Sequence, residues 1–152
     1  MMARVLVVDH EEYIVDLLSL LLEDDGQPGQ NYRVLERYRQ FLKENDRILL
    51  KVPQVIFAQK LWRGGKFTEN QAYLNPEIFV RQFYKPAVDL FGPHLKGLVF
   101  EQEYQRKNER VSPEKLAESL DTFFASIPED RRYHVELRTE QYLSKPVPAV
   151  LE

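Results

Sequence analysis

The fold of this chain is decided by the stretch from residue 98 to residue 138, LVFEQEYQRKNERVSPEKLAESLDTFFASIPEDRRYHVELR. It begins with a short β-branched and aromatic run, 98–103, and ends with another, 133–138, as buried strands do. Between these runs, Ser112-Pro113-Glu114 is typical of a helix start, with a capping hydroxyl, a proline at the first helical position and an acid in the first turn. Apolar residues then recur at helical spacing as far as Ile127. The stretch therefore predicts a strand, a helix and a parallel strand.

The same alternation of strands and helices extends toward the N-terminus. The expected elements are a strand at 3–9, a helix at 11–25, a second helix around 34–42, a strand at 47–52, and a helix from Asn75-Pro76-Glu77 that restarts at Pro86. Residues 54–74 are expected to be the least regular part, with the loosest point at Arg63-Gly64-Gly65-Lys66. We therefore predict a single α/β domain over residues 1–152. Its four-stranded parallel βα series forms either a partial (half) TIM-barrel-like sheet or a flavodoxin-like sheet.

The composition excludes several classes of protein. Of the 152 residues, 43% are hydrophobic, which is enough for one packed core. The net charge of −3 lacks the basic excess of a nucleic-acid binder, and the absence of cysteine excludes disulfides and thiolate metal sites. No apolar run approaches the length of a membrane span, and the N-terminus has no signal-peptide pattern. We expect a cytoplasmic protein with no cofactor, no nucleic-acid partner and no membrane partner.

Most of the chain, from about residue 38 to residue 152, resembles the YecE-like family of unknown function. The matching pieces are Leu50-Lys51-Val52-Pro53, the run FGPHLKGLVF at 91–100, and Val135-Glu136-Leu137-Arg138, in the order and at about the spacing of that family. The resemblance implies a TIM-barrel-like (βα) fold. Because the family continues beyond the point that corresponds to Glu152, it also implies that this chain forms only a segment of such a barrel.

The first 26 residues instead resemble the start of a response-regulator receiver domain, through the run RVLVVDHEE at 4–12, the helix after it and Gly26. Receivers hold magnesium with two adjacent acids. Asp9 matches one of these acids and is a weak metal candidate, whereas His10 occupies the neighbouring place. The phosphorylated aspartate of receivers has no counterpart, so we expect no phosphate transfer to this chain. The two resemblances together indicate a composite or chimeric protein.

Charged side chains gather on one face of the expected strands. Side chains alternate along a strand, so the apolar residues that must pack under helices leave the charged residues on the opposite face. By this rule five residues converge near the carboxyl ends of the strands, where barrel enzymes place their sites: Lys51, Glu101, Glu103, Glu136 and Arg138. The paired carboxylates are typical of general acid–base catalysis or glycoside cleavage. The alternative is a layer of ion pairs in which three acids and two bases nearly neutralise one another.

These features leave three functional interpretations open. The leading one is a folded (βα) composite without an established activity. The second is an enzyme or binder of a small sugar-like or anionic ligand that uses Lys51, Glu101, Glu136 and Arg138. The third is a receiver-like signalling module that uses Asp9. A partial barrel leaves open sheet edges, and open edges favour pairing with another chain, so we also expect a homodimer.

Overall fold

The computed structural model describes residues 5–6, 39–40 and 42–152. The expected helix at 11–25 and Asp9 lie outside the described residues, as does most of the expected helix around 34–42. Of the expected strand at 3–9, only β1 (Val5–Leu6) is described, and its two residues lie parallel to Arg47 and Ile48. The prediction of four full parallel strands is therefore not established at its first strand.

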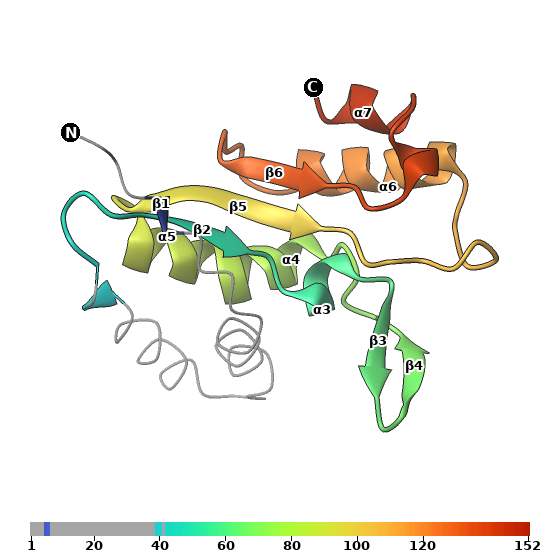
Figure 1. Ribbon diagram of the computed structural model, residues 1–152, viewed down its shortest axis with the longest axis horizontal. Helices are drawn as coiled ribbons and strands as arrows, with labels where there is room; N and C mark the ends of the chain where they lie inside the picture. Colours follow the sequence, from blue (N-terminus) through green and yellow to red (C-terminus); the bar gives the residue numbers. More distant parts are fainter. Residues whose placement is uncertain (1–4, 7–38, 41) are drawn as a thin grey trace.

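Three longer strands form the parallel sheet and point the same way in Figure 1. They are β2 (Arg47–Lys51), β5 (Leu95–Glu101) and β6 (Tyr133–Glu136), in that spatial order. The order in space follows the order along the chain, and each pair of neighbours is joined through helical segments, as the alternation in the sequence predicts. The α/β class and the parallel pairing are confirmed.

The helical segments are α3 (Gln54–Phe57), α4 (Pro76–Ile78), the π-helix η1 (Phe79–Tyr84), α5 (Lys85–Phe91), α6 (Pro113–Ala125), the 3-10 helix η2 (Glu140–Tyr142) and α7 (Val147–Val150). Two of them, α4 and α6, begin where the sequence signals predict. The side chain of Asn75 accepts a hydrogen bond from the Ile78 N–H at 3.0 Å, and that of Ser112 from the Lys115 N–H at 3.2 Å. Each cap satisfies a donor that a helix start otherwise leaves unpaired.

The expected kink or restart at Pro86 takes the form of a change of helix type rather than a break. The chain passes without a break from α4 through η1 into α5, and the Lys85 N–H bonds to the carbonyl of Val80, five residues earlier. Proline has no N–H for the α-helical bond and its ring crowds the preceding turn. The wider turn ends directly before Pro86, which then occupies the first turn of α5.

The helical segments η1 and α6 pack on the same side of the sheet. The ring of Phe100 on β5 lies 5.4 Å from Phe79 of η1 and 5.9 Å from Phe123 of α6, and these two rings are 5.7 Å apart. The core is therefore an aromatic cluster between one face of the sheet and the helices. The opposite face, here called the open face, carries Leu49, Lys51, Val99, Glu101, His134 and Glu136, and none of these is fully buried.

A β-hairpin occupies the segment that the sequence analysis expected to be irregular, so that expectation is wrong there. Strands β3 (Lys60–Arg63) and β4 (Lys66–Glu69) pair antiparallel and project from the rest of the molecule (Figure 1). The two residues of the turn, Gly64 and Gly65, have φ of 56° and 82°. Positive φ at both central residues defines the tight hairpin turn that favours glycine.

Strand β5 lies three residues earlier at its start than predicted, and two residues earlier at its end. It pairs Leu95 with Ile48 and Gly97 with Leu49, so Lys96 is an extra residue at an irregularity in the ladder. The extra residue turns Leu95 toward the core side, where it is buried. Because the strand ends at Glu101, Glu103 lies beyond it.

Candidate functional site

Four of the five predicted site residues form one chain of ion pairs at the carboxyl ends of the strands. Glu101 accepts from Lys51 Nζ at 2.7 Å through Oε1 and lies 3.1 Å from Arg138 Nη2 through Oε2. The Arg138 Nε donates to Glu136 Oε1 at 3.0 Å. We call Lys51, Glu101, Glu136 and Arg138 the strand-end cluster. The sequence prediction that these side chains converge is confirmed.

The register of the sheet explains why an arginine joins the two acids. Glu101 and Glu136 are direct partners across β5 and β6, and like charges in that position repel each other. Arg138 lies two residues beyond Glu136 and contacts both carboxylates, which offsets the repulsion. Its backbone is held by Gln102: the Arg138 N–H donates to Gln102 Oε1 at 3.3 Å, and the Gln102 N–H donates to the Glu136 carbonyl at 2.9 Å.

One end of the cluster is largely shielded from solvent, and the other end is half exposed. The side chains of Glu101 and Lys51 are 13% and 26% exposed, whereas those of Arg138 and Glu136 are 45% and 50% exposed. Two cations face two carboxylates, so the formal charges balance. The Arg138–Glu136 end offers donors and acceptors to solvent, and the Lys51–Glu101 end supports it from inside.

Glu103 is not part of this cluster, which corrects the sequence prediction. Its carboxylate accepts the Gln59 N–H at 2.9 and 3.0 Å and the side-chain amide of Gln105 at 3.1 Å. Burial raises the pKa of Glu103 above its usual value, although these hydrogen bonds oppose the shift. Its role is to hold the loop that leads into the hairpin. Sequence reasoning missed Gln59, Gln102 and Gln105 because isolated amides carry no motif.

One polar atom at this end of the sheet has no partner within the described part of the chain. Thr139 follows Arg138 directly, is 3% exposed, and its Oγ1 makes no hydrogen bond to a described residue. A buried hydroxyl without a partner costs about 1–3 kcal/mol, so such atoms are uncommon in folded proteins. The end of β6 therefore holds both a charged cluster and an unsatisfied donor.

Metal sites are not assembled in the part of the chain that the structure describes: no three side chains of the ligating types converge there. Asp9 and His10 fall outside the described residues. His94 Nδ1 lies 3.0 Å from the Asp46 carbonyl, and His134 lies on the open face, exposed and opposite Val99. His94 therefore links the turn before β5 to the loop before β2, whereas His134 lies on the surface of the sheet.

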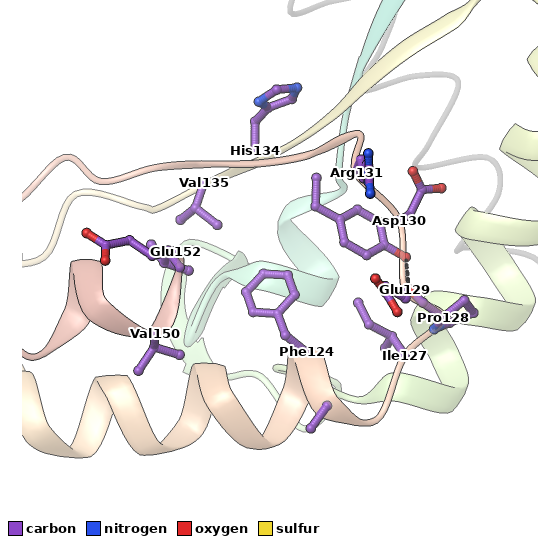
Figure 2. Close-up of a pocket in the computed structure, with 13 residues that line it drawn as sticks. Phe124, Ile127, Pro128, Glu129, Asp130, Arg131, His134, Val135, Val150 and Glu152 are labelled. Atoms are coloured by element: carbon purple, nitrogen blue, oxygen red, sulfur yellow. Dashed lines mark hydrogen bonds between the residues drawn. The ribbon is translucent and has the colours of Figure 1, made fainter.

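A groove of about 920 Å³ lies beside β6, the last strand in the sheet order (Figure 2). Val135 points into it toward Phe124 and Val150, whereas His134 points to the other side of the strand. The alternation on β6 is thus as predicted. Asp130, at one end of the groove, is already held by Arg132 and Tyr84 at 2.6 and 2.9 Å. Among the described residues, β6 has a strand partner only on the β5 side.

No helix among the described residues is both long enough and apolar enough to cross a membrane. Comparisons of the chain with protein-family models, with characterised proteins and with solved structures found no match.

Proposed function

We propose that the strand-end cluster binds a small, uncharged, polyhydroxylated ligand of the sugar type. The observation that carries the proposal is the charge balance of a half-exposed cluster at the carboxyl ends of parallel strands. Ligand sites on sheets of this kind lie at those ends. Arg138 and Glu136 offer a donor and an acceptor side by side, which suits the paired hydroxyls of a sugar ring.

The balance of charge separates this ligand class from the anionic one. Glu103 belongs to another network, so two carboxylates face Lys51 and Arg138. An anion would have to compete with Glu101 and Glu136 for both cations, whereas a neutral hydroxyl adds hydrogen bonds without separating an ion pair.

We also propose that the chain has a partial TIM-barrel-like fold. A sheet whose order in space follows the chain, and one face of which is covered by the described helices, is the arrangement of a partial TIM-barrel-like fold. We propose that two copies pair through the outer edge of β6, where the groove lies. Light scattering at micromolar concentration tests this: a homodimer has twice the mass of the 18.0 kDa chain, and a mass of one chain that persists on concentration overturns it.

The ligand proposal is tested by titrating the protein with neutral mono- and disaccharides and with inorganic phosphate, followed by NMR or calorimetry. We expect saturable binding of at least one neutral sugar and none of phosphate. Glu136→Gln is the variant of choice, because its side chain is 50% exposed and its loss perturbs the fold little. It should weaken binding about tenfold, the size of one hydrogen bond to a charged group.

Glu118→Gln is the matched control, since Glu118 is an exposed glutamate on α6. It should leave sugar binding unchanged. Binding of phosphate in place of sugars, or sugar binding that is equal in both variants, overturns the proposal. Failure of every sugar to bind overturns it as well.

A further inference from the structure

The tip of the β3–β4 hairpin exposes two aromatic rings. All six residues from Trp62 to Phe67 are exposed, and the side chains of Trp62 and Phe67 are 63% and 64% accessible. The two residues are direct partners across the hairpin, and their rings meet edge to face with centroids 4.9 Å apart. Aromatic side chains of this size are normally buried or placed at an interface. The pair forms a small apolar wedge at the point of the hairpin.

Two cations flank this wedge, and no acid among the described residues pairs with them. Arg63 and Lys66 are direct partners across the turn, an arrangement in which like charges repel. Within the described residues, neither makes an ion pair or a hydrogen bond through its side chain. Lys60, lower on the same hairpin, is instead paired with Glu109 at 3.0 Å. The base of the hairpin is thus neutralised, and the tip is left positive on a chain whose net charge is −3.

The hairpin is held firmly at its base. The Asn70 side-chain amide donates to the carbonyls of Val55 and Ala58, both at 2.6 Å, and the Asn70 N–H donates to the Gln59 carbonyl at 2.9 Å. The Gln59 N–H is in turn bound by Glu103. A tip on a fixed base loses little conformational freedom when it binds, which favours binding.

We propose that this tip docks on the surface of an anionic phospholipid bilayer. Trp62 and Phe67 enter the interfacial layer, where amphipathic and aromatic rings are favoured, and Arg63 and Lys66 contact lipid phosphates. The proposal is independent of the ligand site, because the tip shares no residue with the strand-end cluster. It departs from the expectation of no membrane partner, which rested on the absence of a spanning segment.

The ring geometry favours a bilayer over a nucleic acid. Single-stranded nucleic acids bind through separate aromatic planes along a positively charged groove. Here the two rings lie at 72° to each other and in mutual contact, on a convex tip, so they present one wedge rather than a row of stacking platforms. A convex, positively charged, aromatic tip suits insertion between lipid headgroups.

Trp62 is the only tryptophan of the chain, so its fluorescence reports directly on the tip. The full-length protein is titrated with vesicles of phosphatidylcholine alone and with vesicles of phosphatidylcholine and phosphatidylserine in equal parts. We expect a blue shift of the emission and protection from acrylamide quenching with the anionic vesicles only. Removing both cations in Arg63→Gln/Lys66→Gln should weaken the association by about 25-fold, fivefold for each cation. Phe67→Ser should reduce the blue shift.

Two variants serve as matched controls: Tyr104→Ser removes an aromatic side chain that is 75% exposed elsewhere, and Lys96→Gln removes an exposed cation of β5. Both should bind anionic vesicles as the unmodified chain does. Circular dichroism verifies that each variant folds, and all five substituted positions are exposed. An unchanged emission at millimolar anionic lipid overturns the proposal. A blue shift produced by an oligonucleotide and not by vesicles also overturns it, in favour of a nucleic-acid partner.

Discussion

Glu101 and Glu103 are two residues apart in the chain, yet their carboxylates serve separate networks. Glu101, the last residue of β5, accepts from Lys51 Nζ on the neighbouring strand at 2.7 Å. Glu103, just beyond the strand, accepts the backbone N–H of Gln59 at the base of the hairpin. One acid joins neighbouring strands to each other, and the other joins the sheet to its projecting arm.

The first prediction concerns this second acid. Glu103→Ala should leave the Gln59 N–H without its acceptor and loosen the base of the hairpin. Hydrogen exchange of the Gln59 amide should accelerate by about tenfold or more, as expected for the loss of one hydrogen bond to a charged group. Glu69→Ala, a change at an exposed acid of β4, is the control and should leave that amide unaffected. Equal exchange in the two variants would contradict the role given to Glu103.

The second prediction concerns acid stability. The Arg132 guanidinium, which donates to Asp130, is the main cause that lowers the pKa of Asp130 to about 2. The folded carboxylate therefore binds a proton less readily than the unfolded one, whose pKa is about 3.9. The stabilisation, about 2 kcal/mol, is present above pH ~4 and is lost as the pH falls toward 2.

Urea unfolding of the unmodified chain and of Asp130→Asn measures this contribution. The two should differ in unfolding free energy at pH 6 and converge near pH 2. Tyr84→Phe removes one donor to Asp130 and should have a smaller effect of the same sign. A difference that stays constant with pH would show that Asp130 acts through packing rather than charge.

The third prediction uses the contact across Gly97. A Cβ added there would lie 2.6 Å from Cδ2 of Leu49 and 2.9 Å from Cδ2 of His134, both on the open face. Gly97→Ala should therefore destabilise the fold by about 1–3 kcal/mol through overpacking. The double variant Gly97→Ala/Leu49→Ala should recover part of the loss, because Leu49 is the nearer neighbour. Chemical denaturation measures both, and additive losses would show that the two sites do not touch.

The fourth prediction compares the two acids of the strand-end cluster. Glu101→Ala should lower the free energy of unfolding by about 3 kcal/mol, because it removes the shared acceptor of Lys51 and Arg138 at the shielded end of the cluster. Glu136→Ala should cost less than about 1 kcal/mol, since its side chain is half exposed. Thermal or urea unfolding ranks the two. The reverse order would show that the buried end of the cluster is not where its stabilisation lies.

The convergence of the cluster was predictable because it depends on alternation alone. Once 47–52, 98–103 and 133–138 are taken as parallel strands, the parity of Lys51, Glu101, Glu136 and Arg138 places them on one face. Caps at Asn75 and Ser112 were predictable for a similar reason, since a local hydrogen bond needs only a residue type and a spacing.

Glu103 was placed wrongly because parity holds only inside a strand. Strand β5 ends at Glu101, so Glu103 lies beyond it and its carboxylate accepts the Gln59 N–H instead. Where a strand ends depends on the strands beside it, and one sequence does not specify that. The hairpin had a readable signal, two glycines between Trp62-Arg63 and Lys66-Phe67, but polar and charged residues around it resemble a loop.

The π-helical turn in η1 has a rotational consequence for the helix after it. In an α-helix each residue advances by about 100°, so a residue five positions on faces about 140° away. Here Phe79 and Tyr84, five residues apart, have ring centroids 5.8 Å apart, and Tyr84 also reaches Asp130. The segment holds one residue more than an α-helical turn needs. That surplus residue sets the angular phase of α5 and decides that Ala87, Leu90 and Phe91 are the residues of α5 that are buried.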